Sequence, residues 1–363
     1  MDQATFAFDP QASNDCDAAG FQIGWDHAHH GLVPPPGLLL EGTPVGQGWR
    51  AGRAVFGRRT LAATRHVRQW LTLRTQAWRQ GIAFETTQVT AHYLGQIETP
   101  HCPVTRRALG GCDATAPVVE RLNRAAGYAA GNLAVISAAA ADARAGTPDA
   151  REALARAARV EAGIEVPPAG LSVADCCRLA VLASFATPLP FAEAARVPLR
   201  VLPPNRVRLL NAPQGLQAMV THLFAGPGWS ARLRELADRL PAADPALRHD
   251  FQLFVGAFAA RLPAAGADAQ AVRHALEDAW ACERVARRWQ GFVLALGEKA
   301  TETLLARTAE AGVAGVRTLV HEPAEATAGW SLASRGRVLV SRRRGPVRSL
   351  ATEGALPQPA RTA

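Results

Sequence analysis

Lysine and paired cysteines are what this chain most clearly lacks. Lys299 is the only lysine among 363 residues, so arginine carries nearly all of the positive charge. No two of the six cysteines are spaced as CxxC, and Cys176 and Cys177 are neighbours, whose Cα atoms lie too close for a relaxed disulfide. These absences argue against a zinc ribbon and against a disulfide framework, and they favour a reducing cytoplasm.

Long apolar runs and several well-known catalytic motifs are also missing. No stretch approaches the ~18 apolar residues that a membrane helix requires, and the N-terminus has neither the basic nor the apolar region of a secretory signal. We therefore expect a cytoplasmic protein with no membrane partner. The GxSxG, P-loop, HExxH and GxGxxG motifs are absent too, which leaves the enzyme classes that carry them without support.

Aromatic residues are few, at 6% of the chain, whereas the net charge is strongly positive. A formal charge of +9 and a pI near 10.2 favour an acidic partner such as nucleic acid. Abundant Ala, Arg, Gly and Pro are equally what a GC-rich coding bias produces, so the charge also has an explanation without selection for binding. The length allows two domains, with a core built from Leu, Val and Ala.

Residues 1–57 are rich in glycine and proline and show little periodicity, which predicts an irregular N-terminal segment. Within it, Trp25–His30 holds three histidines: His27, His29 and His30. Such a cluster can bind a metal, but no second group of ligands accompanies it. We therefore interpret it as a polar loop.

The rest of the chain divides at Pro167-Pro168. Residues 58–165 are predicted to hold a basic helix and a small α/β unit. Residues 169–350 are predicted to form a mainly α-helical domain with a short C-terminal β-hairpin, and residues 351–363 a disordered tail. The strands expected in that hairpin are 316–320 and 337–341.

A helix is predicted over residues 58–80, with Gly81 as its stop. Val67, Trp70 and Leu71 share its apolar face. Arginines lie on a neighbouring stripe, where they could contact phosphates or simply be solvated. The candidate nucleic-acid contacts on this helix are Arg58, Arg65 and Arg68.

A motif in residues 101–144 is the most informative feature of the sequence. It reads Cys-Pro-x-Thr from Cys102, Glu-Arg-x-Asn from Glu120, Gly-Tyr from Gly127 and Gly-Asn from Gly131, and an alanine-rich helix follows. This order resembles the HNH endonucleases, the ββα-metal nucleases, in their phage-type branch. The resemblance implies an α+β fold with a small ββα-metal-like unit, a prokaryotic source, and Mg²⁺ or Mn²⁺ as the metal.

The resemblance also implies a role for individual residues. Glu120 takes the position of the metal-binding carboxylate, and Asn132 that of the asparagine that bonds across the loop. Arg121 stands where the catalytic histidine belongs, although the phage-type branch often carries arginine there as well. Because arginine stays protonated, Arg121 cannot act as a general base, but it could clamp a phosphate. Ala141 stands near the position of the last metal ligand and cannot bind metal.

A structural zinc site is a second possibility in the same region. His101, Cys102 and Cys112 could supply ligands, but the spacing lacks CxxC, so we favour a buried apolar role for Cys102.

The sequence thus predicts a nucleic-acid-binding protein derived from an HNH-type nuclease, with DNA as the expected partner and with weak or no phosphodiesterase activity. Any activity would be metal-dependent endonuclease cleavage. The alternative is a non-enzymatic interaction or scaffold protein whose helical C-terminal half binds another protein. The residues expected to contact phosphates near the motif are Arg106, Arg107, Arg121 and Arg124.

Overall fold

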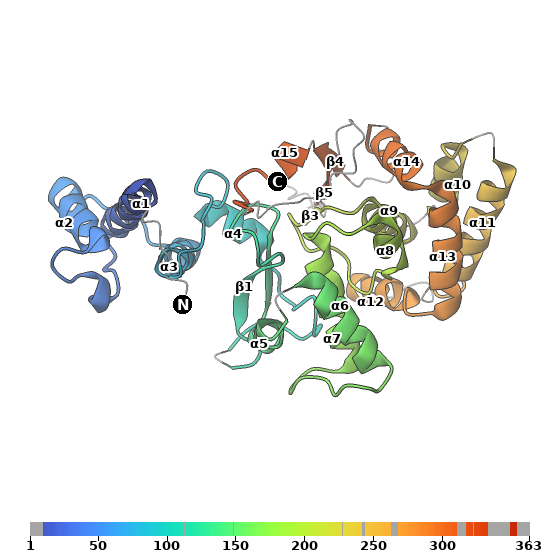
Figure 1. Cartoon of the computed structure of the whole chain (residues 1–363), viewed down its shortest axis with the longest axis horizontal. Coiled ribbons are helices and arrows are strands. Elements are labelled where there is room, and N and C mark those ends of the chain that lie inside the picture. Colours follow the sequence, from blue (N-terminus) through green and yellow to red (C-terminus); the bar gives the residue numbers. More distant parts are fainter. Residues whose placement is uncertain are drawn as a thin grey trace, which may run out of the picture. The chain divides into compact units, whose positions relative to one another are not determined.

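The computed structural model describes residues 10–111, 113–147, 149–226, 228–241, 244–262, 268–310, 317–321, 323–332 and 349–353. The chain forms two compact units, residues 1–96 and residues 97–363, each described here by itself (Figure 1). Helices dominate both units, and the strands lie in the second. The α+β class is therefore confirmed. No helix in these ranges is both long and apolar enough to cross a membrane.

The first unit begins with two helices, α1 (Pro10–His29) and α2 (Pro44–Phe56), where we expected an irregular segment. That expectation was wrong because helix propensity was judged without tertiary packing. The glycines that weaken each helix let the two backbones touch: a Cβ on Gly48 would stand 1.9 Å from the carbonyl oxygen of Phe21. A Cβ on Gly24 would come equally close to the carbonyl oxygen of Val45.

The predicted basic helix is α3 (Arg65–Arg79), which begins later than expected because Thr64 caps it. The Thr64 side chain accepts a hydrogen bond from the amide of Val67, and Gly81 has a positive φ just after the helix. Buried Arg74, inside the helix, forms an ion pair with Asp26 of α1. A short helix, α4 (Ala91–Ile97), leads to the second unit.

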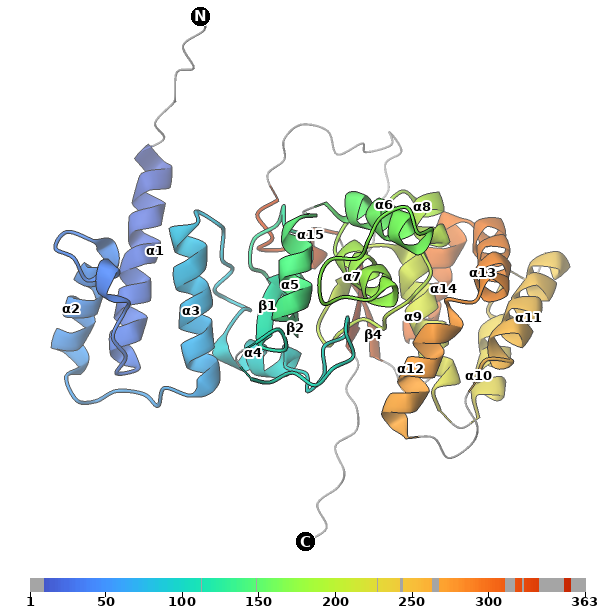
Figure 2. The same cartoon turned by 90° about the horizontal axis from the view of Figure 1, so that it is seen from below.

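The second unit opens with an antiparallel pair of strands, β1 (Pro117–Arg121) and β2 (Leu133–Ser137), followed directly by helix α5 (Ala138–Ala145). Figure 2 shows this helix beside the hairpin. Every residue of β2 is buried. The expected order of two strands and a helix is therefore present.

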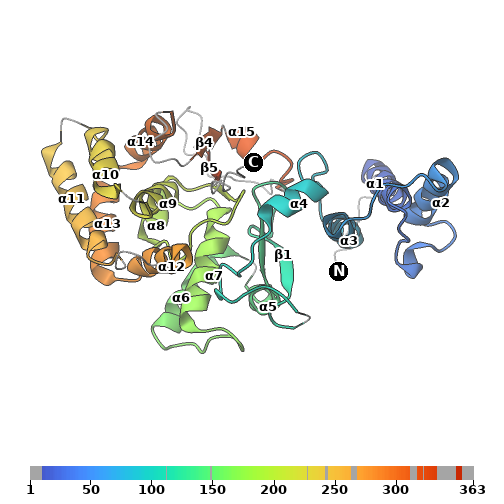
Figure 3. The ribbon, with the colours of Figure 1, turned by 180° about the vertical axis from the view of Figure 1, so that it is seen from behind.

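Helices α6 (Ala150–Glu161) and α7 (Val173–Phe185) follow as a packed pair (Figure 3). Asp149 caps α6 by accepting from the amides of Arg151 and Glu152. The expected division near Pro167-Pro168 differs from that of the structure, which joins both sides of these prolines in one unit.

The remaining helices of the second unit surround an aromatic core. Trp280 and Trp289 are fully buried and meet edge to face with ring centroids 5.3 Å apart. One of these helices ends at Ala279, where the buried Trp280 and its neighbours form a turn. The helices are α8 (Phe191–Arg196), α9 (Ala212–Phe224), α10 (Trp229–Asp238), α11 (Pro245–Ala259), α12 (Ala269–Ala279), α13 (Glu283–Leu296), α14 (Glu298–Glu310) and α15 (Pro323–Ala326).

A small antiparallel sheet completes this unit. It has the order β3–β5–β4, built from β3 (Arg208–Leu209), β5 (Ser349–Glu353) and β4 (Arg317–His321). The strand expected at 316–320 matches β4, whereas 337–341 lies outside the described residues. The expected disordered tail, 351–363, overlaps the last three residues of β5, and residues 354–363 lie outside the described ranges.

Candidate functional site

The β1–β2 hairpin positions the residues of the motif. Glu120 pairs with Ala134 and Arg121 with Leu133 in the strand register, so both charged residues stand at the end of β1 where the loop begins. The loop returns through Gly131, whose φ of 88° is a conformation that glycine adopts without strain. Asn132 therefore lies opposite Leu122, whose amide donates to the carbonyl oxygen of Asn132 at 2.8 Å.

Asn132 fixes the shape of this loop. It is fully buried, and its side-chain oxygen accepts from the amide of Asn123 at 2.8 Å. Its side-chain nitrogen donates to the carbonyl oxygens of Asn123 and Gly127, both at 3.0 Å. This is the cross-loop geometry that the resemblance to the HNH nucleases implied for this position.

Glu120 is already neutralised within the chain. Arg124, four residues further on, donates from Nε to Glu120 Oε1 at 2.7 Å. Both side chains are largely buried, with 15% of Glu120 and 21% of Arg124 exposed. Such a charge-assisted bond in a shielded position is stronger than a surface ion pair, so Glu120 has a fixed partner.

Arg144 is the residue of this site that the sequence analysis missed. It stands near the end of α5 with only 2% of its surface exposed. Its guanidinium donates to the carbonyl oxygen of Leu122 at 2.8 Å and to that of Thr147. Its own carbonyl oxygen accepts from Arg124 at 3.1 Å, which ties the helix end to the Glu120–Arg124 pair.

The charge of Arg144 is kept despite its burial. Burial lowers the pKa of Arg144 to about 10, and the nearby positive charge of Arg124 acts in the same direction, whereas Glu120 and Asp149 oppose it. This pKa still lies far above neutral pH. Arg144 also lies three residues after Ala141, hence on the same side of the helix. That spacing is the sequence signal that would have found it.

Arg121 also stabilises the loop, through hydrogen bonds to backbone carbonyl oxygens. Its guanidinium donates to the carbonyl oxygens of Arg124 at 2.9 Å and Ala126 at 2.7 Å. It also lies over the ring of Tyr128, 5.1 Å from the ring centroid. Burial raises the pKa of Tyr128, although Arg121 beside it opposes the shift. Arg121 is thus a structural cation of the loop with part of its surface still accessible.

The helical half of the unit packs against this loop. Trp330 accepts from the amide of Gly127 at 2.7 Å and donates from its indole to the carbonyl oxygen of Ala130 at 3.0 Å. A Cβ on Gly131 would meet the side chain of Arg208 at 2.4 Å, so the loop fits tightly against β3. The motif is therefore an integral part of residues 97–363.

Arg106 and Arg107, both expected to contact phosphates, have different surroundings. Arg106 forms ion pairs with Asp278 at 2.7 Å and with the buried Glu277 at 3.1 Å. Burial alone would lower the pKa of Arg106, but these two carboxylates raise it above its ordinary value. Arg107 is exposed and forms no ion pair among the described residues. Of the two, Arg107 is the side chain available to a ligand.

The proposed zinc ligands do not converge in the part of the chain that the structure describes. Cys102 is buried, and its sulfur accepts from the amides of Ser137 at 3.3 Å and Thr105 at 3.5 Å. His101 forms a backbone bridge with Ala108. Cys112 lies outside the described residues.

The candidate residues of the first unit lie on its surface. Arg58, Arg65 and Arg68 are exposed, on α3 and on the segment before it. The histidines expected in a polar loop belong instead to the end of α1 and the turn after it. His27 is buried against the carbonyl oxygen of Ile23, and the ring of His29 stacks on Phe56 at 4.2 Å.

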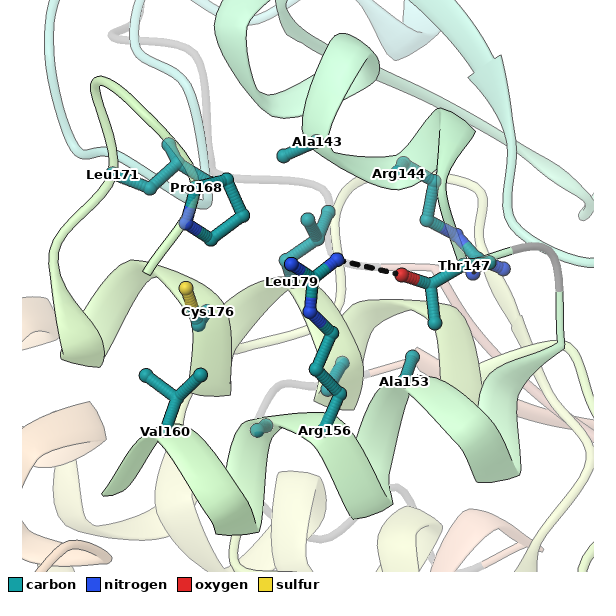
Figure 4. A pocket seen from close by; sticks show the side chains of 12 residues that line it. Ala143, Arg144, Thr147, Ala153, Arg156, Val160, Pro168, Leu171, Cys176 and Leu179 are labelled. Atoms are coloured by element: carbon teal, nitrogen blue, oxygen red, sulfur yellow. Dashed lines mark hydrogen bonds between the residues drawn. The ribbon is translucent and has the colours of Figure 1, made fainter. Parts of the chain in front are cut away.

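A small cavity lies between α5, α6 and α7, close to the stem of Arg144 (Figure 4). Its volume is about 30 Å³, enough for one or two waters but not for a substrate. Arg156 donates to the hydroxyl of Thr147 across one side of it, as the dashed line shows. We interpret this cavity as a packing gap.

The residues present do not fit a divalent metal ion. Glu120 is the sole carboxylate at the end of β1, and Arg124 already holds one of its oxygens. Ala141 supplies no donor from α5, and the guanidinium of Arg144 adds positive charge where a cation would have to enter. No group of three or more potential metal ligands occurs in the described ranges.

No family model, no curated protein and no solved structure matches this chain. The resemblance of residues 101–144 to the HNH nucleases therefore rests on the residues of the motif alone.

Proposed function

We propose that this chain is a nucleic-acid-binding protein built on an HNH-type framework, in which arginines have replaced the metal and phosphodiester cleavage is lost. The observation that carries the proposal is the Glu120–Arg124–Arg144 arrangement. The guanidinium of Arg124 bonds to the one carboxylate at the place where the nucleases hold a cation, and the buried Arg144 adds a second positive charge nearby. These positive charges can attract phosphate, which is the electrostatic role of the metal ion in the nucleases.

The surrounding charge supports binding rather than hydrolysis. Three arginines in and around the loop, Arg121, Arg124 and Arg144, outnumber the carboxylate of Glu120, and Asp149 lies further along the chain. Exposed Arg107 adds a cation on the segment before β1. The arginines stay protonated at neutral pH and cannot act as the general base that hydrolysis needs to activate water, and the carboxylate of Glu120 is held by Arg124.

The proposal is tested by fluorescence anisotropy of a labelled DNA duplex, titrated with the full chain at several salt concentrations. We expect binding that weakens steeply with salt, because each phosphate contact releases counterions. Arg107→Gln should reduce the slope of log K against log salt by about 1, since it removes one phosphate contact without disturbing the fold. Arg307→Gln, which removes an exposed arginine of α14, is the matched control.

Glu120→Gln separates the two roles open to that carboxylate. If it only balances Arg124 and Arg144, its neutralisation leaves more positive charge and should raise the affinity for DNA at least severalfold. Weaker binding by the folded Glu120→Gln protein, or no binding by the wild type at low salt, would contradict the proposal. In the second case the scaffold alternative would stand.

A further inference from the structure

Three arginines on α13 surround a hollow that the motif does not involve. Arg284, Arg287, Arg288 and Gly291 line it from α13, and Asp250 lines it from α11. The two helices lie side by side in Figures 1 and 3. The hollow measures about 410 Å³, far larger than the gap beside Arg144.

The charges in this hollow are not balanced. Arg284, Arg287 and Arg288 are exposed, and none of them forms an ion pair with any residue that the structure describes. Many other arginines of this unit do have such partners, for example Arg106 with Asp278 and Arg200 with Glu161. Arg284 and Arg288 are four residues apart, a spacing at which like charges destabilise a helix. Asp250 is the one acidic side chain lining the hollow, against three cations.

The shape of the hollow comes from a glycine. Gly291 lies one turn beyond Arg287 and Arg288 on the same side of α13, and a Cβ there would meet no atom within 4 Å. A glycine inside a helix costs stability relative to alanine, and no close packing at this position requires it. Its effect is to leave room between the guanidinium groups.

We propose that this hollow, the α13 arginine site, binds closely spaced phosphate groups, such as those of a nucleic-acid backbone or of a small polyphosphate. Guanidinium groups bind phosphate oxygens in pairs, and one helix face presents three of them at fixed spacings. An anion bound there would relieve the repulsion among the arginines. The site is separate from the β1–β2 hairpin and does not depend on the function proposed for it.

The first experiment measures tripolyphosphate binding to the full chain by isothermal titration calorimetry. Arg287→Gln/Arg288→Gln should weaken binding by about tenfold or more, the effect expected when charge-assisted contacts are lost. Arg151→Gln/Arg307→Gln is the matched control, since it removes the same charge from exposed positions on α6 and α14 and should leave the affinity within about twofold.

A second variant tests the site without changing any charge. Gly291→Leu fills the hollow, and the open space around Gly291 means that the fold should tolerate it. We expect it to weaken tripolyphosphate binding as strongly as the double arginine variant, while Gly291→Ala has a smaller effect. No tripolyphosphate binding by the wild type, or equal affinities for the wild type, Gly291→Leu and the double arginine variant, would overturn the proposal.

Competition with a labelled single-stranded oligonucleotide identifies the source of the phosphates. Displacement of tripolyphosphate by the oligonucleotide, lost in Gly291→Leu, would support a backbone as the ligand. Tripolyphosphate binding without such displacement would support a small polyphosphate. Oligonucleotide binding that only Arg107→Gln weakens, with no tripolyphosphate affinity, would sustain the proposed function and overturn this inference.

Discussion

At the scale of single residues, buried polar side chains determine the form of the candidate site. Asn132 and Arg144 have almost no exposed surface, yet each forms several hydrogen bonds to backbone atoms of the loop and of its surroundings. Buried polar groups are tolerated when they are paired, and their loss leaves partners unsatisfied. The hairpin therefore depends on these two side chains for its conformation.

Replacing Asn132 should strongly destabilise the unit formed by residues 97–363. Asn132→Ala leaves the amide and carbonyl of Asn123 and the carbonyl of Gly127 without their partner, and we expect a loss of roughly 3 kcal/mol or more. Urea unfolding measures this loss in the free energy of unfolding. Gln252→Ala, at an exposed position on α11, should change stability by no more than about 0.5 kcal/mol. A similar small change for Asn132→Ala would show that the loop does not need its cross-link.

A second residue-scale prediction concerns acid stability. Burial, followed by the charge of Arg273, lowers the pKa of His222 on α9 to about 4 from an ordinary value of 6.5. Between these values the unfolded chain binds a proton that the folded chain does not, so stability falls as pH falls from about 6.5 to 4. The expected loss from this group is about 3 kcal/mol.

His222→Gln should remove this part of the pH dependence, which urea unfolding at pH 7 and pH 4.5 can measure. His249→Gln, which changes an exposed histidine on α11, is the control and should leave the difference between the two pH values intact. An unchanged pH dependence in His222→Gln would mean that His222 is protonated within the folded protein.

At the scale of helices and strands, local signals can be recognised in the sequence, whereas tertiary contacts cannot. The strands of the hairpin and the capped start of α6 were predictable, because alternation and an N-cap aspartate are local signals. Helices α1 and α2 were not predictable in this way, since their glycines are unfavourable until the two backbones meet.

The close contact between α1 and α2 at Gly48 predicts opposite effects for two glycine-to-alanine substitutions. Gly48→Ala places a Cβ 1.9 Å from the carbonyl oxygen of Phe21, so the helices must separate, and we expect a loss of about 2 kcal/mol or more. Gly256→Ala on α11 meets no atom within 4 Å and should instead stabilise the protein by roughly 0.5–1 kcal/mol. Thermal unfolding followed by circular dichroism compares the two. Equal shifts would contradict the close approach.

In the candidate site, too, the motif residues could be recognised from the sequence, whereas the long-range contacts could not. Glu120, Arg121 and Asn132 were identified from the motif, but Arg144 was not, because a fully buried arginine is uncommon and its partners are backbone carbonyls. The pairing of Arg106 with Glu277 and Asp278 was equally hidden, since 171 and 172 residues separate the partners. Arg106 was consequently predicted as a phosphate contact, and its ion pairs give it a structural role.

At the scale of the whole molecule, the hairpin and the helical half of residues 97–363 are linked through buried polar contacts. Glu277 is almost fully buried and accepts from the amide of Leu202 at 2.9 Å, from Arg273 at 3.1 Å and from Arg106 at 3.1 Å. Asn123 donates to the carbonyl oxygen of Ala186 on the helical side. These contacts explain why the structure does not divide at the proline pair.

Breaking the Glu277 contacts should affect both halves of this unit. Glu277→Leu leaves Arg106 without its buried partner, and we expect a loss of about 3–5 kcal/mol. Hydrogen exchange of the β1 and β2 amides should accelerate together with that of the α12 and α13 amides. Asp278→Asn, at a side chain that is 59% exposed, should have a much smaller effect. Faster exchange confined to α12 would indicate that the halves open independently.

The central claim is that arginines stand in for the metal, and its most direct test is the metal dependence of DNA binding. Anisotropy of a labelled duplex should be measured in EDTA, in Mg²⁺ and in Mn²⁺ at constant ionic strength, with the DNA recovered and examined on a gel. We predict affinities that agree within about twofold and DNA that remains intact, because Arg124 already neutralises Glu120 and Arg144 adds positive charge nearby. Tight binding only with metal, or cleavage that Glu120→Gln abolishes, would contradict the account.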